Sequence, residues 1–466
     1  MSARPAPRHV AVVDIGKTNA KLALHDLAAG EDLFVRTEPN AVRGDGPYPH
    51  YDEARLLAFL VDALADCAGR HPFEAISVTT HGASAALVGD TELALPILDY
   101  EYDGPESCRE DYDRLRPDFA ETLSPRLPNG LNVGAQLFWQ ERTFPEAFAR
   151  ARHVLCLPQY WAWRLSGVAA MEITSIACHT DLWAPRREDF SSLVAGRGWG
   201  RLFTAPLRSA FDALGPLAPD LARRIGLGAA PMPVHCGIHD SNASLLPHLL
   251  RHAPPFTVLS TGTWVVSFAV GGAARPIEPA AGILLNVDAF GRTSLSGRFM
   301  GGREFDRLTG GAPREPTPAE IAEVVEARIF ALPTFVPGTG PFPDGAGRWS
   351  REPDGLSPGV RTAVASLYCA MVTAEMLALT GADGPTIVEG PFARNRLFLA
   401  ALQAATGRAV VPSAGATGTT AGAALLAGSP PAAPTSTIDA EASPASGHAT
   451  EALAAYAADW LAAARA

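Results

Sequence analysis

Charge is scarce in this chain, and its balance is acidic. Only 19% of the 466 residues are charged, and the net charge is −11 with no long basic run. Nucleic acid and anionic membrane surfaces are therefore not expected as partners. No apolar run reaches the roughly 18 residues that a membrane span requires, and residues 1–9 hold no apolar core of a secretory signal.

Cysteine is also rare. The six cysteines are spread singly along the chain, with no Cys-x-x-Cys pair, and a chain of this length builds a core without disulfides. We therefore expect reduced thiols and a cytoplasmic protein. The length and a hydrophobic share of 47% indicate a globular chain of two domains.

What the chain does have is a polar turn between two strands near its start. Residues 10–15 form an apolar run, Gly16 follows, and apolar residues alternate from Ala20 to Leu24. The polar residues of this turn are Asp14, Lys17, Thr18, Asn19 and Lys21. A carboxylate for a metal, free amides at a glycine, hydroxyls and a lysine together suit a nucleotide phosphate. An ordinary polar hairpin turn is the alternative.

The turn is not a P-loop, and it has a second copy. A P-loop needs glycine at position 11, where this chain has Ala, and a helix after the turn. The second copy is Val258–Phe268, again strand, turn and strand, with Thr261, Gly262 and Thr263 at the turn. Two copies half a chain length apart suggest a duplicated domain whose halves each offer a turn to one ligand.

The densest cluster of candidate ligands runs from His235 to Asp240. Zinc could use His235, Cys236 and His239, although no fourth ligand has a recognisable spacing. Asp240 stands at a predicted helix start, where it is placed to take a proton from a substrate hydroxyl. Capping of that helix is the alternative role for Asp240.

Two segments carry candidate sugar ligands. His81-Gly82 follows a predicted strand, and the imidazole would hydrogen-bond a polyol there unless it is a satisfied core histidine. Asp99, Glu101 and Asp103 alternate along the chain, so the three carboxylates would face one side and accept hydrogen bonds from sugar hydroxyls. A solvated strand end is the alternative for these residues.

A third turn, from Glu389 to Asn395, follows a predicted buried strand and opens a helix. Small residues there would let the backbone approach a flat ligand, and Asn395 would either cap the helix or touch that ligand. The apolar pattern predicts helices at 51–68, 137–153, 159–165, 241–246, 360–379, 395–406, near 420 and at 451–464, broken helix over 191–228, and strands at 73–80, 282–287 and 386–389. This alternation favours an α/β fold.

Taken together, these segments resemble the FGGY carbohydrate kinases of the actin-like ATPase superfamily, from about Val10 to Gly428. The matching segments are Asp14–Lys21 and Ser260–Thr263 (phosphate motifs), Gly237–Asp240 (catalytic aspartate), Met300–Asp306 (a turn near the nucleotide), Glu389–Asn395 (adenosine motif) and Ala416–Leu426 (connecting helix). Two departures stand out: Pro391 and Phe392 replace the usual glycines, and Lys17 replaces a frequent threonine and would add a phosphate contact.

The resemblance implies two actin-like, ribonuclease H-like domains with an interdomain active-site cleft. We expect residues 1–248 to bind sugar and phosphate, and residues 249–466, with a mobile 428–448 segment, to bind nucleotide. The implied activity is phosphorylation of a sugar hydroxyl with ATP and Mg²⁺. The implied site residues are Asp240 as general base and sugar ligand; His81, Gly82, Asp99 and Glu101 for the sugar; Asp14 for Mg²⁺; and Lys17, Thr18, Asn19, Lys21, Thr261, Gly262, Thr263, Gly302, Gly390, Pro391 and Asn395 for the nucleotide.

The expected partner is a small-molecule sugar, with a homodimer as the protein assembly considered. Glycerol kinases have Arg-Glu where this chain has Gly82-Ala83, so glycerol is disfavoured. His81-Gly82 is similar to the pair in xylulose kinases, while Leu157–Gly167 and Thr174–Asp181 are similar to rhamnulose and fuculose kinases. A ketose or deoxyketose is therefore the expected substrate. The alternatives are an actin-like nucleotide-binding or ATPase protein without sugar turnover and, more distantly, a metal-dependent hydrolase.

Overall fold

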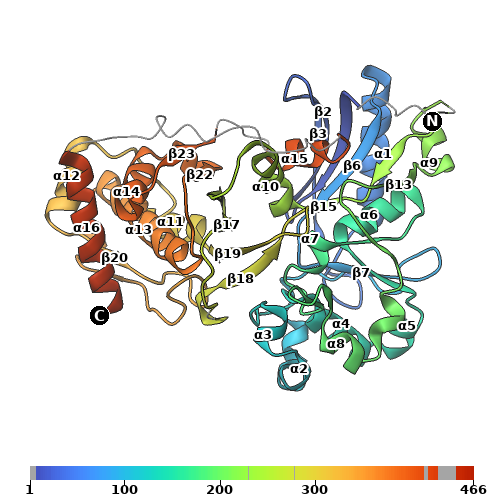
Figure 1. Ribbon diagram of the computed structural model, residues 1–466, viewed down its shortest axis with the longest axis horizontal. Helices are drawn as coiled ribbons and strands as arrows, with labels where there is room; N and C mark the ends of the chain where they lie inside the picture. The colour runs from blue at the N-terminus through green and yellow to red at the C-terminus, as the bar shows by residue number, and fades with distance from the viewer. Residues whose placement is uncertain (1–6, 229, 278, 414–417, 429–447) are drawn as a thin grey trace. The chain divides into compact units, whose positions relative to one another are not determined.

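The computed structural model describes residues 7–228, 230–277, 279–413, 418–428 and 448–466, which form two compact units (Figure 1). Unit 1 consists of the described residues up to Leu250. Two later segments also belong to unit 1: Asn286–Thr293 and the described part of Thr417–Ala433. The remaining described residues form unit 2. The sequence analysis places a single boundary between 248 and 249 and does not anticipate these two later segments. The segment expected to be mobile, 428–448, lies outside the described residues except at its two ends.

Unit 1 is built on a sheet with the strand order β13-β14-β6-β1-β2-β3, and β15 also pairs with β6. Strands β1, β2 and β3 are antiparallel, whereas β6 runs parallel to β1, β14 and β15. The strands are β1 (His9–Ile15), β2 (Asn19–Asp26), β3 (Glu31–Pro39), β6 (Ala75–Thr80), β13 (Ala213–Pro216), β14 (Pro233–His235) and β15 (Ile238–His239).

Alternation along β1 gives this sheet two apolar faces. Ala11, Val13 and Ile15 lie in a buried cluster with α1 and α6, while Val10 and Val12 lie in a second cluster with α10 and α15. Helices therefore cover both faces, and even-numbered Asp14 falls on the α10 and α15 side. The main helices are α1 (Glu53–Arg70), α4 (Val133–Thr143), α6 (Leu157–Ser166), α10 (Asp240–Arg251) and α15 (Gly418–Leu425).

Unit 2 repeats the topology of unit 1. Its sheet has the order β18-β19-β17-β16-β22-β23, with β16, β17 and β19 antiparallel and β22 parallel to both β16 and β23. The chain order β16, β17, β19, α13, β22, α14, β23 matches β1, β2, β3, α1, β6, α6, β14 of unit 1, which confirms the predicted duplication. The bounds are β16 (Phe256–Thr261), β17 (Val265–Val270), β18 (Ile283–Val287), β19 (Thr293–Phe299), β22 (Thr386–Glu389) and β23 (Val410–Pro412).

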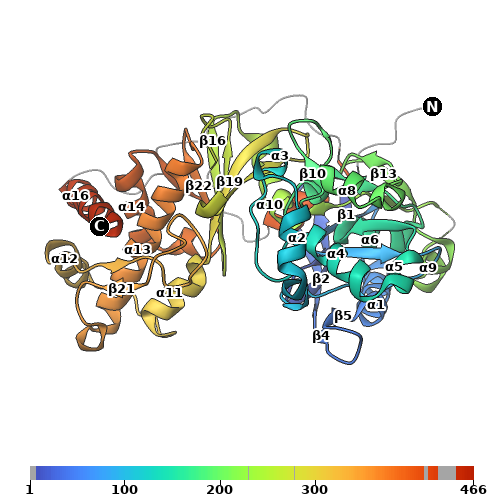
Figure 2. The same cartoon turned by 90° about the horizontal axis from the view of Figure 1, so that it is seen from below.

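Helices α13 (Pro358–Leu379), α14 (Arg396–Thr406) and α16 (His448–Arg465) pack side by side in unit 2 (Figures 1 and 2). Helix α13 corrects one expectation, because its 22 residues and a mean hydropathy of 1.6 over an 18-residue window satisfy the length and composition of a membrane span. Since 78% of that window is buried inside the protein, α13 equally fits the description of a buried core helix. The apolar run was missed because small and polar residues interrupt it.

Shorter elements complete the two units. They are β4 (Val42–Arg43), β5 (His50–Tyr51), β7 (Ala85–Val88), β8 (His153–Cys156), β9 (Met171–Glu172), β10 (Trp183–Ala184), β11 (Asp189–Phe190), β12 (Leu207–Arg208), β20 (Ala331–Leu332), β21 (Arg348–Trp349), α2 (Arg109–Leu115), α3 (Phe119–Thr122), α5 (Pro145–Ala149), α7 (Ile173–Ile176), α8 (Ser192–Gly196), α9 (Pro219–Arg224), α11 (Gly301–Thr309) and α12 (Pro318–Glu326), with five 3₁₀ turns between them. All six cysteines are free, as expected.

Candidate active site

In unit 1 the predicted catalytic and sugar residues meet where parallel strands end. Asp14 of β1 is in register with Thr79 of β6, and Thr80 is in register with His239 of β15. His81 continues from β6, and its amide donates to the carbonyl of Ile15 at 2.9 Å. The carboxyl ends of parallel strands are the usual place for ligand sites in open α/β sheets. Asp14, His81 and Asp240 therefore belong to one edge of the sheet.

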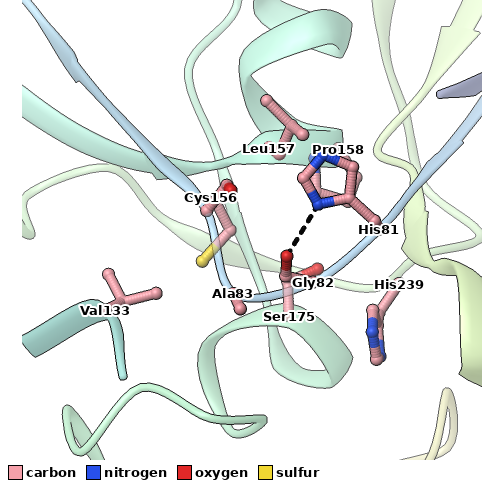
Figure 3. A pocket seen from close by; sticks show the side chains of 10 residues that line it. His81, Gly82, Ala83, Val133, Cys156, Leu157, Pro158, Ser175 and His239 are labelled. Carbon is pink, nitrogen blue, oxygen red and sulfur yellow. Dashed lines mark hydrogen bonds between the residues drawn. The ribbon is translucent and has the colours of Figure 1, made fainter. Parts of the chain in front are cut away.

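His81 is buried and neutral at ordinary pH. Its Nδ1 is 2.8 Å from the carbonyl oxygen of Gly82 (Figure 3), which makes Nδ1 the protonated nitrogen and leaves Nε2 as an acceptor. Burial lowers the pKa of His81 to about 4. Nε2 is buried and has no hydrogen-bond partner among the described residues. A buried acceptor of this kind is suited to a ligand hydroxyl.

Gly82 is required by close packing. A Cβ at this position would lie 2.6 Å from Nε2 of His239, closer than any side chain tolerates. Figure 3 shows both imidazoles beside Gly82, in a small pocket also lined by Ser84, Cys156 and Ser175. Gly82 thus acts through its lack of a side chain, since any larger residue would displace His239.

Asp240 is the first residue of α10, and one third of its side chain is exposed. Its Oδ1 accepts a hydrogen bond from the Ser241 amide at 2.6 Å and lies 3.2 Å from Nε2 of His239. Its Oδ2 has no partner in the described part of the chain. A helix cap would accept from the second or third helical amide, so the capping alternative is not what the structure shows. Burial raises the pKa of Asp240, against the opposing influence of His81 and Ser241.

At the first turn, Asp14 and Lys21 are partners across β1 and β2. The Lys21 ammonium lies 3.3 Å from Asp14 Oδ2 and also donates to the hydroxyl of Thr420. Burial raises the pKa of Asp14, and Lys21 opposes that shift. Thr18 and Asn19 are exposed at the tip of the turn. The turn thus presents a carboxylate, an ammonium and hydroxyl groups together.

Lys17 points to the residues predicted for the sugar, Asp99 and Glu101. Its ammonium forms an ion pair with Asp99 and lies 3.6 Å from Glu101 Oε2. The rings of Tyr51 and Tyr100 flank it, with centroids 5.2 and 5.0 Å away. The structure therefore groups Lys17 with the sugar candidates, whereas the sequence analysis assigns it to phosphate.

In unit 2, glycines bring the predicted nucleotide residues together. A Cβ on Gly302 would lie 2.1 Å from the carbonyl oxygen of Gly262, and one on Gly390 would lie 1.9 Å from that of Thr261. Gly390 also has a φ of +80°, which disfavours any other residue. The Thr261–Thr263 turn is therefore packed backbone to backbone against the start of α11 and the end of β22. Gly262 and Thr263 remain exposed.

Two other nucleotide candidates, Thr261 and Asn395, have structural roles, and a third, Pro391, is exposed. The Thr261 hydroxyl donates to the Glu389 carbonyl and accepts from the Phe392 amide at 3.1 Å, so it ties the turn to β22. Asn395 caps α14, because its Oδ1 accepts from the Phe398 amide at 3.0 Å. Pro391 is exposed and, as a proline, offers no amide to a ligand.

Comparisons with known proteins identify the family of this chain. Residues 253–436 match the model of the carbohydrate kinase FGGY family, C-terminal domain. A solved structure described as a carbohydrate kinase from Novosphingobium aromaticivorans is 38% identical, with a TM-score of 0.81 over 89% of this chain and 93% of that chain. The chain belongs to the FGGY family of carbohydrate kinases.

More distant structures share the fold. A xylulose kinase from Rhodospirillum rubrum is 18% identical, with a TM-score of 0.73 over 99% of this chain and 98% of that one. A gluconate kinase from Lactobacillus acidophilus is 15% identical, with a TM-score of 0.75 over 91% and 89%. A search of curated protein sequences finds no match. The predicted family, the α/β class with two actin-like domains and the carbohydrate kinase activity are confirmed.

Several residues of this FGGY kinase site were not foreseen. Tyr51 and Tyr100 flank His81 as well as Lys17, with ring centroids 5.2 and 5.4 Å from the imidazole. Thr420 reaches Lys21 from a segment 399 positions later. Because these segments are far apart in the sequence, no local residue pattern predicts the contacts between them. His239 was considered only as a zinc ligand, although its position next to Asp240 in the sequence indicates that it could belong to the site.

The available donor side chains do not suit zinc but do suit Mg²⁺. No three His, Cys, Asp or Glu side chains are grouped for a metal anywhere in the described residues, and His235 Nδ1 is 3.0 Å from the carbonyl of Phe211. The zinc alternative is thus unsupported. Mg²⁺ needs less from the protein, because it keeps several waters and takes one or two carboxylates beside substrate phosphates. Asp14, at a turn with exposed hydroxyls, fits that requirement.

Substituting Gly302 with Ala tests the second turn of this kinase. The new Cβ would clash with the Gly262 carbonyl, so the turn must move, and displacements of this size are costly for a positioned ligand. We expect the KM for ATP to rise by about tenfold or more. Gly355→Ala is the control, because its Cβ would meet nothing within 4 Å. Equal steady-state kinetics for both variants would show that this turn does not bind nucleotide.

Proposed function

We propose that this kinase phosphorylates one hydroxyl of an uncharged ketose or deoxyketose, with Asp240 as the general base. Family membership implies ATP as the phosphoryl donor and a small sugar as acceptor, so the ATPase without sugar turnover is set aside. The observation that carries the proposal is the Asp240 carboxylate, with Oδ1 held by the Ser241 amide and 3.2 Å from His239 Nε2, and Oδ2 without a partner among the described residues. The reduced cysteines favour a cytoplasmic reaction.

The proposed proton transfer follows from the state of each group. Burial lowers the pKa of His239 to about 4, so the imidazole that lies 3.2 Å from Asp240 Oδ1 is neutral. The hydrogen bond from the Ser241 amide to Oδ1 orients the carboxylate and leaves Oδ2 to accept the proton of the attacking hydroxyl. A raised pKa makes Asp240 a better acceptor, provided that it remains ionised at the working pH. Nε2 of His81 would accept a hydrogen bond from a second hydroxyl and orient the sugar.

Phosphoryl transfer depends mainly on positioning and on stabilisation of charge. We assign phosphate contacts to Thr18, Asn19 and Lys21 in unit 1 and to Gly262 and Thr263 in unit 2. Asp14 would hold Mg²⁺ through water, and the ion would neutralise charge on the phosphates when bound. Lys21 limits the negative charge at Asp14, so the turn remains compatible with an anionic nucleotide.

The substrate class rests on the His81-Gly82 pair. The buried, unpartnered Nε2 of His81 suits a polyol hydroxyl, and the sequence has neither the arginine nor the glutamate expected of glycerol kinases at this place. The test is a coupled ADP-release assay with xylulose, ribulose, rhamnulose, fuculose and erythrulose, and with glycerol and gluconate as comparators. Turnover that depends on a ketose supports the proposal. Turnover with glycerol or gluconate alone, or none that depends on sugar, overturns it.

A further inference from the structure

The strongest unassigned feature is the placement of the lysines. Lys17 and Lys21 are the only two lysines in 466 residues, and the other 36 basic side chains are arginines. The chain therefore uses arginine wherever a generic cation suffices. An ammonium is a compact point charge with three rotatable donors, whereas a guanidinium is a planar fork. Two lysines in one turn indicate that each position requires the compact group.

Lys17 sits in an enclosed polar cage. One fifth of its side chain is exposed, its ammonium is paired with Asp99, and the rings of Tyr51 and Tyr100 lie on either side. Asp99 is held in turn, because Oδ1 also accepts from the Glu101 amide at 3.1 Å and lies 3.4 Å from the Tyr51 hydroxyl. The second oxygen, Oδ2, has no partner in the described residues. The cage thus presents ammonium donors beside an open carboxylate acceptor.

The same two tyrosine rings also flank His81, which places its unpartnered Nε2 next to the cage. Lys17 and Asp240 both influence the pKa of His81, in opposite directions, so these charges lie within one electrostatic neighbourhood. A donor at Lys17 and acceptors at Asp99 and His81 match the donor and acceptor character of neighbouring hydroxyls on a polyol.

From this geometry we propose that Lys17 and Asp99 form a specificity-determining pair for the sugar, selecting uncharged polyols against sugar acids. The ion pair cancels the lysine charge, and Glu101 and Asp240 leave the neighbourhood negative. A substrate carboxylate would therefore meet like charge and compete with Asp99 for Lys17, which is strongly unfavourable. This inference rests on the proposed function, and it replaces phosphate binding as the role of Lys17.

The first test separates sugar from nucleotide. Lys17→Met should raise the KM for the preferred ketose by about tenfold to a hundredfold, with the KM for MgATP unchanged. Lys17→Arg should behave similarly, because the cage fits an ammonium. Arg152→Met, which removes an exposed ion pair with Asp90, is the matched control and should leave both constants unchanged. A rise in the KM for MgATP alone, or no change in either KM, overturns the inference.

The second test concerns charge. Asp99→Asn frees the Lys17 cation, so turnover with the ketose should fall while gluconate, which has a carboxylate, should gain relative to it. An unchanged ketose-to-gluconate ratio in a variant of wild-type thermal stability contradicts the proposed selection. If the wild-type enzyme itself uses gluconate and no ketose, the proposed function fails. If it uses a ketose but Lys17→Met alters only the KM for MgATP, this inference alone fails.

A third test needs no turnover. Reductive ¹³C-methylation labels only two lysine side chains and the amino terminus, so each lysine gives its own NMR signal. Single Lys→Arg variants assign them. We expect the Lys17 signal to shift when the ketose is added and the Lys21 signal to shift with the non-hydrolysable ATP analogue AMP-PNP. A Lys17 signal that responds to AMP-PNP and not to the ketose would overturn the proposal.

Discussion

Replacing Asp240 with Asn is expected to lower kcat by about 10²- to 10⁴-fold, the contribution of a general base. Asn keeps an oxygen that can accept from the Ser241 amide, so α10 should begin as before. Binding of sugar and ATP should therefore persist, as calorimetry would show. The exposed Asp220→Asn on α9 is the control and should retain full activity.

The pH dependence of kcat tests the same role of Asp240. A base must be ionised, and burial raises the pKa of Asp240, so wild-type kcat should fall as the pH drops through that raised value. The residual activity of Asp240→Asn should lack this acidic limb. A loss of less than about tenfold, or an unchanged acidic limb in the variant, would remove Asp240 from the role of base.

Replacing Trp460 with Ala is expected to cost about 3–5 kcal/mol of unfolding free energy, as large buried aromatics do. The side chain is 1% exposed, and its indole donates to the Ala331 carbonyl at 2.7 Å. It also meets Phe342 and Tyr368 edge to face, with centroids 5.9 and 6.2 Å away. The substitution removes this packing and leaves a buried carbonyl without its donor.

Denaturant unfolding with a probe in unit 2 measures this effect. Asp459→Ala on the same helix removes only an exposed ion pair with Arg328, which should be worth less than about 1 kcal/mol. If the two variants are equally stable, α16 contributes nothing to the core of unit 2. The burial of Leu453, Tyr456 and Trp460 of α16 would then not stabilise the protein.

The residues that were predicted correctly belong to local patterns. Both hairpins, the strand at 386–389 and the helix after Asp240 follow from alternation or helical spacing within a dozen residues. Helix 137–153 was predicted as continuous, but Pro145 lacks the amide that would continue the ladder, and the structure has α4, α5 and then β8. The 191–228 region was predicted as broken helix, and β13 was missed because its pairing partner, β14, lies 17 residues beyond its end.

The residues of the candidate site also fall into two groups: those that a local sequence pattern predicts and those that it does not. Asp14 lies near the end of β1, His81 follows β6 and Asp240 begins α10, and such ends of strands and helices can be predicted from the sequence. The partners of Lys17 cannot be predicted in this way, because Tyr51 lies in the short strand β5 and Asp99 and Tyr100 lie in a loop, and the paths of these segments depend on the whole fold. Asn395 carried two predicted roles, and only the hydrogen bond to Phe398 selects the cap. The substrate class depends on such side-chain placement, which spacing does not determine.

The return of α15 to unit 1 limits how this duplicated chain can be divided. Gly422 lets α15 approach so closely that a Cβ there would lie 1.7 Å from the Ala243 carbonyl, and Ala423 and Ala424 complete the apolar face of β1. A gene fragment that stops after Leu250 would encode every strand of the first sheet yet leave Val10 and Val12 without this cover. The two units are therefore interleaved along the chain, because a segment from the second half of the coding sequence supplies part of the core of unit 1.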